Sequence, residues 1–115
     1  MKKFVLYEKA REVNREIVKL LKSLNLDKYK SDQLIRASNS SVLNIAEGNG
    51  RFTPKDKVHY FVTARGSVQE TIALFDLMED EELIDKNTAK WFREQLTVLI
   101  KILTKLIMNL KESKS

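Results

Sequence analysis

The scarcity of helix-breaking residues is the feature of this 115-residue chain that most restricts its fold. The sequence contains one proline, Pro54, and three glycines, Gly48, Gly50 and Gly66. Proline and glycine interrupt helices most strongly, whereas the Leu, Ile, Lys and Glu residues that are abundant here are typical of helices. Long helices are therefore expected over most of the chain, which predicts an all-α fold.

Apolar residues recur at helical spacing in four segments of the sequence. These segments predict helices at about 5–24, 31–48, 54–80 and 86–110. Helices of this length with short connections between them favour antiparallel packing of sequence neighbours. We therefore expect residues 1–115 to form a single domain, an antiparallel up-down four-helix bundle.

Capping residues mark where the predicted helices begin and end. Ser31 is a suitable N-cap for the second helix, and the run Gly48–Gly50 is expected to end it. Thr53 can cap the third helix, with Pro54 at its first position, where proline is tolerated. Asp85 is expected to cap the fourth helix.

Charge is unevenly distributed along the chain, whose net charge is +5. Residues 1–75 hold 14 basic and 8 acidic side chains, residues 76–85 hold six acidic and no basic ones, and residues 86–115 hold seven basic and two acidic ones. Outside the acidic segment the net charge is therefore +11, which favours polyanion binding through counterion release. The alternative is that this charge only keeps a small basic protein in solution.

Eight basic residues are the predicted contacts with nucleic-acid phosphates. They lie on one face of the first helix, near the second helix, and on the polar side of the fourth: Arg11, Arg15, Lys19, Lys22, Arg36, Arg51, Lys101 and Lys105. On the first helix Glu8, Glu12 and Glu16 are interleaved with the bases and partly neutralise them. The alternative for that helix is therefore a set of ion pairs within it.

The fourth helix has a wider apolar arc than a bundle helix needs for its own core. Its apolar positions between Leu96 and Leu110 sweep about 200° of the helix circumference. The surplus around Trp91, Val98 and Ile102 is expected to pack against another subunit. The alternative is that this helix lies at the centre of a tight monomer core.

The second helix has two distinct faces. One is compact and rich in small residues that would let a neighbouring helix approach closely: Leu34, Ala37, Ser38, Ser41, Ile45 and Gly48. Gly66, in the middle of the third helix, offers a match to this face. The other face is entirely polar. We hypothesise that its Glu47 pairs with Arg65, while Asn44 and Arg51 bond the turn between helices two and three. The alternative is a network that only holds the fold.

Residue types suited to catalysis or metal binding are scarce. There is no cysteine, and His59 with Asp56 makes only half of the paired acid–histidine motif of a di-iron bundle. The acidic segment Asp76–Asp85 lacks the pattern of a calcium loop and is expected to be solvated charge. Gly48–Gly50 is too short for a phosphate-binding loop. We therefore predict no catalytic residue, no metal and no cofactor, and expect that the protein is not an enzyme.

The sequence also indicates where the protein is found. No segment approaches the roughly 18 uninterrupted apolar residues that cross a bilayer, so no membrane partner is expected. The absence of cysteine suits a reducing compartment. These features predict a cytoplasmic protein.

Three segments of the sequence carry a resemblance to a known family. They are Gln33-Leu34-Ile35-Arg36-Ala37-Ser38, then Asn44-Ile45-Ala46-Glu47-Gly48 followed by Arg51, and then Ala64-Arg65-Gly66-Ser67-Val68-Gln69-Glu70. Their order and spacing resemble the small four-helix-bundle proteins encoded by intervening sequences within bacterial 23S rRNA genes. The same fold family includes the accessory protein of diversity-generating retroelements. Tyr7 stands where the family often has tryptophan, and the first inter-helix turn lacks the family's frequent proline.

The resemblance implies a bundle assembled into a ring, typically a homopentamer, with a basic surface suited to nucleic acid. It implies no enzymatic activity. The expected function is therefore non-catalytic binding of RNA or DNA by an oligomer. The alternative is an accessory scaffold subunit that binds a protein partner such as a reverse transcriptase.

Overall fold

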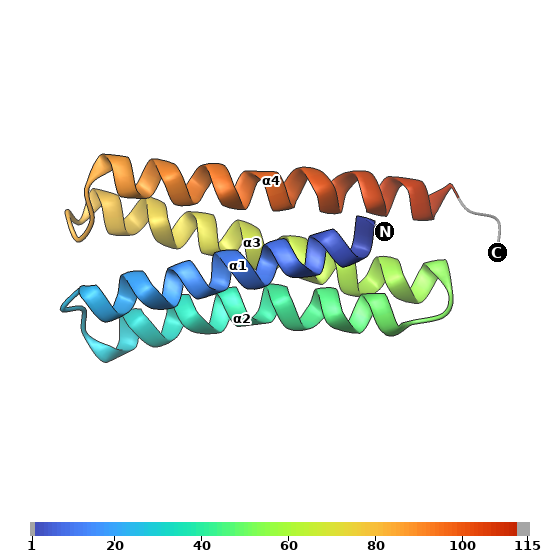
Figure 1. Ribbon diagram of the computed structural model, residues 1–115, viewed down its shortest axis with the longest axis horizontal. Helices are drawn as coiled ribbons and strands as arrows, with labels where there is room; N and C mark the ends of the chain where they lie inside the picture. The colour runs from blue at the N-terminus through green and yellow to red at the C-terminus, as the bar shows by residue number, and fades with distance from the viewer. Residues whose placement is uncertain (1, 113–115) are drawn as a thin grey trace.

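Four helices joined by short turns make up the computed structural model of the protein, which describes residues 2–112. The helices are α1 (Lys2–Ser23), α2 (Lys28–Gly50), α3 (Pro54–Asp80) and α4 (Lys86–Lys111). Each runs antiparallel to the one before it, in a bundle about 49 Å long (Figure 1). The predicted all-α, up-down four-helix bundle is confirmed.

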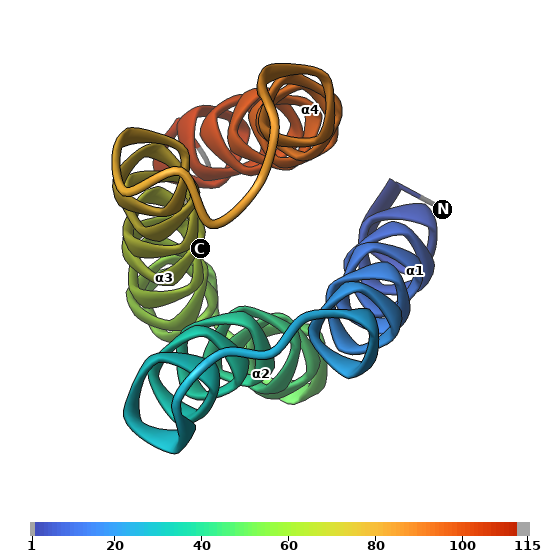
Figure 2. The same ribbon diagram turned by 90° about the vertical axis from the view of Figure 1, so that its left-hand side faces the viewer.

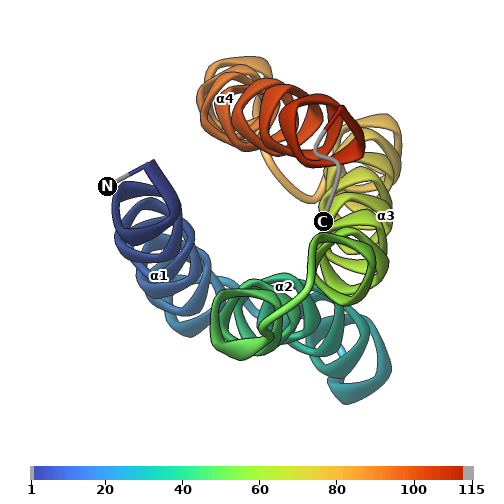
Figure 3. The ribbon, with the colours of Figure 1, turned by 90° about the vertical axis from the view of Figure 1, so that its right-hand side faces the viewer.

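Viewed along the bundle axis, the helices follow an open arc in chain order (Figures 2 and 3). α1 packs on α2, α2 on α3, and α3 on α4, so sequence neighbours are also spatial neighbours. The first and last helices, α1 and α4, pack together more loosely than the other adjacent pairs. Lys9 of α1 donates a hydrogen bond to Gln95 of α4, with 2.6 Å between Nζ and Oε1.

Apolar side chains from all four helices meet in one continuous core. Its largest fully buried members are Leu6, Ile17, Leu34, Ile45, Phe61, Val68, Phe75, Leu96, Leu99 and Leu103. The rings of Phe75 on α3 and Phe92 on α4 stack with their centroids 4.6 Å apart. Burial of one such side chain contributes about 1.5–3 kcal/mol, so this core is the main source of stability.

The compact face predicted for α2 is buried along its whole length. Gly48 packs directly on Phe61 of α3: a Cβ atom at Gly48 would lie 2.5 Å from Phe61 Cε1. Ser38 Oγ donates a hydrogen bond to Asn14 Oδ1 of α1 at 2.6 Å. Gly66 makes no such approach, because no atom of a neighbouring helix lies within 4 Å of its Cβ position. The expectation that Gly66 provides the close contact is wrong, and Gly48 provides it.

Two helix starts follow the predicted capping residues. Thr53 Oγ1 accepts a hydrogen bond from the Asp56 backbone N–H at 3.2 Å, and α3 spans the predicted 54–80. Asp85 Oδ1 accepts from the Thr88 N–H at 2.7 Å at the start of α4. In both cases the cap side chain satisfies a backbone donor that the first helical turn leaves open.

The ends of α2 differ from the prediction of 31–48. Asp27 rather than Ser31 caps the helix, with its Oδ1 accepting from the Lys30 N–H at 2.9 Å, so α2 begins three residues earlier. The helix also continues through Gly48 to Gly50, and the chain leaves it only at Arg51, which has ψ 156°. Gly48 is thus required for packing against α3 and does not break the helix.

Candidate nucleic-acid interface

The four predicted contacts on α1 are all exposed, and two of them are already paired. Arg11 Nη1 lies 3.5 Å from Glu8 Oε1, and Lys19 Nζ lies 3.5 Å from Glu16 Oε2. Arg15 and Lys22 have no carboxylate within ion-pair distance among residues 2–112. The ion pairs expected within this helix therefore take up part of its charge.

Of the other four predicted contacts, one is paired and three are not. Arg51 Nη2 lies 2.9 Å from Glu47 Oε2 in α2. Arg36, Lys101 and Lys105 are exposed, and no described carboxylate lies within 4 Å of their charged groups. Seven of the eight predicted contacts thus lie exposed on α1, α2 and α4, whereas Arg51 is half-buried in the turn after α2.

The hypothesised pair of Glu47 and Arg65 is wrong. Arg65 Nη1 donates to Thr104 Oγ1 of α4 at 3.2 Å, whereas Glu47 pairs with Arg51 in its own helix. Arg65 lies on the flank of α3 that faces α4, so it cannot reach α2. Asn44 Nδ2 donates to the Ser40 carbonyl oxygen at 2.9 Å, one turn back in α2, and does not bond the turn as predicted.

Arg51 does bond the turn between α2 and α3. Its Nη2 atom lies 2.7 Å from Tyr60 Oη, and its guanidinium lies 4.6 Å from the Tyr60 ring centroid. The hydrogen bond with Glu47 raises the pKa of Arg51 above its ordinary value. Arg51 therefore holds the turn, and its charge is less available to a ligand than that of an unpaired arginine.

One hydrogen bond between α2 and α3, that of Ser40 with Ser67, was not predicted. Ser40 Oγ and Ser67 Oγ share a hydrogen bond of 2.8 Å, and Ser67 Oγ also donates to the Thr63 carbonyl oxygen at 3.2 Å. In the sequence, Ser67 between Arg65 and Gln69 is the residue that could have indicated this hydrogen bond. Hydroxyl groups of this kind bond within the fold because burial would otherwise leave them unsatisfied.

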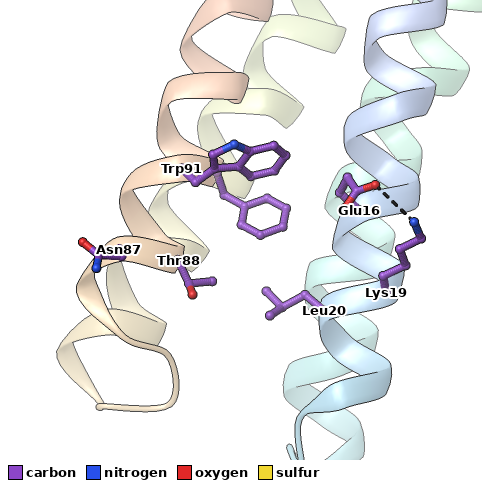
Figure 4. Close-up of a pocket in the computed structure, with 7 residues that line it drawn as sticks. Glu16, Lys19, Leu20, Asn87, Thr88 and Trp91 are labelled. Carbon is purple, nitrogen blue, oxygen red and sulfur yellow. Dashed lines mark hydrogen bonds and ion pairs between the residues drawn. The ribbon is translucent and has the colours of Figure 1, made fainter.

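The predicted oligomer contacts lie on the side of α4 nearest α1. Trp91 and Val98 are 44% and 42% exposed, whereas Ile102 is half-buried and packs against the core. A groove of about 500 Å³ opens between the two helices beside Trp91 (Figure 4). Leu20 of α1 and Phe92 of α4 line it, with Glu16 and Lys19 at the α1 side. Trp91 and Val98 therefore expose apolar surface as predicted, whereas Ile102 exposes less of its side chain.

The acidic segment Asp76–Asp85 is linked to bases of other helices. Arg93 Nη1 lies 2.7 Å from Glu79 Oε1, and Lys30 Nζ lies 2.8 Å from Glu81 Oε1. The hydrogen bond to Glu79 raises the pKa of Arg93, and that to Glu81 raises the pKa of Lys30. Five of the six acidic side chains are exposed, as expected for solvated charge, and Glu79 is half-buried. The ion pairs of Glu79 and Glu81 also join the turn to α4 and α2.

Two further properties concern the described residues alone. Within residues 2–112, no group of three or more His, Cys, Asp or Glu side chains is arranged to hold a metal ion. No helix in that range is long and apolar enough to span a bilayer.

The family profile described as 23S rRNA-intervening sequence protein matches residues 2–105. The chain belongs to this family. The match covers nearly all of the four helices, so it includes the three segments that first indicated the resemblance.

A solved structure shares the bundle of this family member. It is a protein of unknown function from the S23 ribosomal protein family of Bacteroides thetaiotaomicron, 25% identical in sequence, with a TM-score of 0.86. The similarity covers 94% of this chain and 99% of that one. No functionally curated protein matches the sequence. The fold is therefore shared over almost the full length of both chains.

Proposed function

We propose that this family member is a non-catalytic, cytoplasmic oligomer that binds RNA or DNA through its basic outer surface. The observation that carries the proposal is that five of the eight predicted contacts have no carboxylate within the described residues to pair with their positive charge. No carboxylate among residues 2–112 pairs with these exposed cations: Arg15, Lys22, Arg36, Lys101 and Lys105. Exposed, unpaired cations attract phosphates and release condensed counterions when they bind them.

The proposed contacts are to phosphates rather than to base edges. Lysine and arginine on the outside of a rigid helix contact the backbone of a nucleic acid, which carries no direct sequence information. Binding is then largely independent of sequence and weakens steeply with salt. Arg11, Lys19 and Arg51 must exchange an existing carboxylate for a phosphate, so they contribute less than the unpaired cations.

Self-association through α4 is part of the proposal. Exposed Trp91, which lines the groove between α1 and α4, supports it, because an aromatic side chain at an apolar groove is typical of an interface centre. Val98 is also exposed and lies two helical turns further along the same face of α4. Membership of the family favours a homopentamer. Repeating the same cations around a ring would raise the avidity for a long polyanion without any new contact.

A charge-reversal pair with a matched control tests the function. We expect Lys101→Glu/Lys105→Glu to weaken binding to structured RNA and duplex DNA by tenfold or more, about 1.4 kcal/mol, at low salt. The control is Lys86→Glu/Lys90→Glu, which makes the same change in net charge on the same helix at the same i, i+4 spacing. Its affinity should be closer to that of the wild type. Equal losses in both variants would show that only net charge matters.

A scaffold that binds a protein partner, such as a reverse transcriptase, is the second candidate. It is favoured by Phe52 in the turn between α2 and α3, whose side chain is 97% exposed. Exposed aromatic residues on a fixed turn are common centres of protein interfaces. If wild-type protein binds RNA and DNA no better than an unrelated basic protein does, this candidate replaces the first.

A further inference from the structure

Charge is separated along the hairpin of α3 and α4. Residues 57–69 and 95–111 contain no Asp or Glu and five basic residues: Lys57, Arg65, Lys101, Lys105 and Lys111. Residues 70–94, which include the turn, contain eight acidic and three basic residues. Because the two helices are antiparallel, the two acid-free stretches lie side by side, away from the turn (Figure 1).

Arg65 connects the two stretches. Its Nη1 atom donates to Thr104 Oγ1 across the helix interface at 3.2 Å, so the guanidinium is held at the edge of α4. Lys101 precedes Thr104 by three residues, and Lys105 follows it directly, so all three α4 positions lie within about one helical turn of 5.4 Å. Arg65 of α3 is thus bound to a residue of α4 that lies in the same helical turn as two lysines.

None of these cations is neutralised within the described part of the chain. Arg65, Lys101 and Lys105 have no carboxylate within ion-pair distance there. On the same side of α4 the nearest carboxylates in sequence are Glu94 and Glu112, each seven residues, or about 10 Å, from the nearer lysine. Like charges at i, i+4 on one helix, such as Lys101 and Lys105, repel one another, and a bound counter-charge relieves this repulsion.

The α4 side chains of this cluster border a hollow in the outer surface. The hollow has a volume of about 460 Å³ and is lined only by residues 100–112, among them Lys101, Thr104, Lys105 and, at the C-terminal end, Glu112. Arg65 lies beside it, bound to Thr104. Arg65 and Thr104 are half-buried, whereas both lysines are exposed. A half-buried, hydrogen-bonded arginine loses less conformational freedom on binding than a free surface side chain does.

We propose that Arg65, Lys101 and Lys105 form a binding site for a backbone phosphate of the nucleic acid. This proposal rests on the proposed function and assigns a ligand role to Arg65, for which the sequence predicts only a structural pair with Glu47. Each guanidinium or ammonium group donates several hydrogen bonds and carries a full positive charge, which matches an anionic phosphate with several acceptor oxygens. The Thr104 hydroxyl positions the arginine at the site.

Neutralising Arg65 while keeping a donor for Thr104 tests the site. We expect Arg65→Gln to weaken binding to a short RNA duplex at low salt by about tenfold, as loss of a charge-assisted contact does. Arg65→Lys should retain most of the affinity because it retains the charge. The control Lys90→Gln removes an exposed cation from the acidic half of α4 and should bind within about twofold of the wild type.

A second measurement does not depend on how the variants fold. The side-chain Nε resonance of Arg65 in the wild type should shift as the RNA duplex is added, because the guanidinium binds a phosphate. If the wild type binds RNA while the Arg65 resonance stays unchanged, or if folded Arg65→Gln binds as the wild type does, the phosphate site is refuted. If the wild type binds no RNA or DNA at all, the proposed function itself fails.

Discussion

Two glycines in the bundle have opposite physical roles, although both lie within helices. A methyl group at Gly48 would meet the buried ring of Phe61, whereas one at Gly66 would meet open space. We expect Gly66→Ala to raise stability by about 1 kcal/mol through helix propensity. Gly48→Ala gains the same propensity but overpacks the core, at a cost of about 1–3 kcal/mol, so a net loss is expected.

Thermal or urea unfolding of the two alanine variants checks this pair of predictions. Each variant makes the same chemical change, so the two serve as controls for one another. A stabilised Gly48→Ala protein would mean that Phe61 can move aside and that the close packing of α2 on α3 is not required.

Arg65 illustrates how far single residues can be interpreted from sequence. Its position beside an apolar stripe correctly indicated a charge that needs a partner inside the fold. A helical wheel places Arg65 on one flank of α3, but the handedness of the bundle decides whether that flank faces α2 or α4. Spacing along one chain does not contain that handedness, so the sequence predicts Glu47 as the partner of Arg65, whereas the structure shows Thr104.

At the level of elements, helix bounds were predictable where a cap and the apolar pattern agree. Pro54 after Thr53 defined the start of α3, and Asp85 that of α4. The start of α2 was missed because Asp27 and Ser31 are both good caps, and only the fold selects between them. Its end was missed because a glycine required for packing has the same appearance in sequence as one that ends a helix.

The cap of α4 gives stability a dependence on pH. The backbone N–H of Thr88 lowers the pKa of Asp85 below its ordinary value of 3.8. A carboxylate with a lowered pKa in the folded state stabilises the fold above the unfolded value, and this contribution is lost as pH falls through the folded value. Stability from this cap should therefore be complete at neutral pH and decrease below about pH 4.

The variant Asp85→Asn isolates this effect, because asparagine caps a helix without titrating. Melting temperatures of the wild type and Asp85→Asn should be compared between pH 7 and pH 3. The melting temperature of the wild type, relative to that of Asp85→Asn, should decrease as the pH is lowered to 3. A difference between the two proteins that stays constant over this range would show that Asp85 does not act as a charged cap.

For the whole molecule, assembly depends on the apolar surplus of α4. The sequence indicated this surplus through the width of the apolar arc, but not that Ile102 would be half-buried against the core. We expect Trp91→Glu/Val98→Glu to reduce the mass in solution from that of an oligomer to that of a single chain. Burying two carboxylates in an apolar interface is strongly unfavourable.

Light scattering at micromolar concentration measures that mass. Leu43→Glu is the matched control, since Leu43 is an exposed apolar residue on α2, at 65%, outside the proposed interface. It should leave the mass unchanged. Wild-type protein that has the mass of one chain at this concentration would contradict assembly through α4.

The central claim is that the uncompensated cations of the outer surface bind nucleic-acid phosphates. It is tested most directly by the affinity of the wild type for duplex RNA as a function of salt. If the five unpaired cations all contact phosphates, a plot of the logarithm of the binding constant against the logarithm of the salt concentration should have a slope of about −4 or steeper. A slope shallower than about −1, or no binding at low salt, would contradict the account.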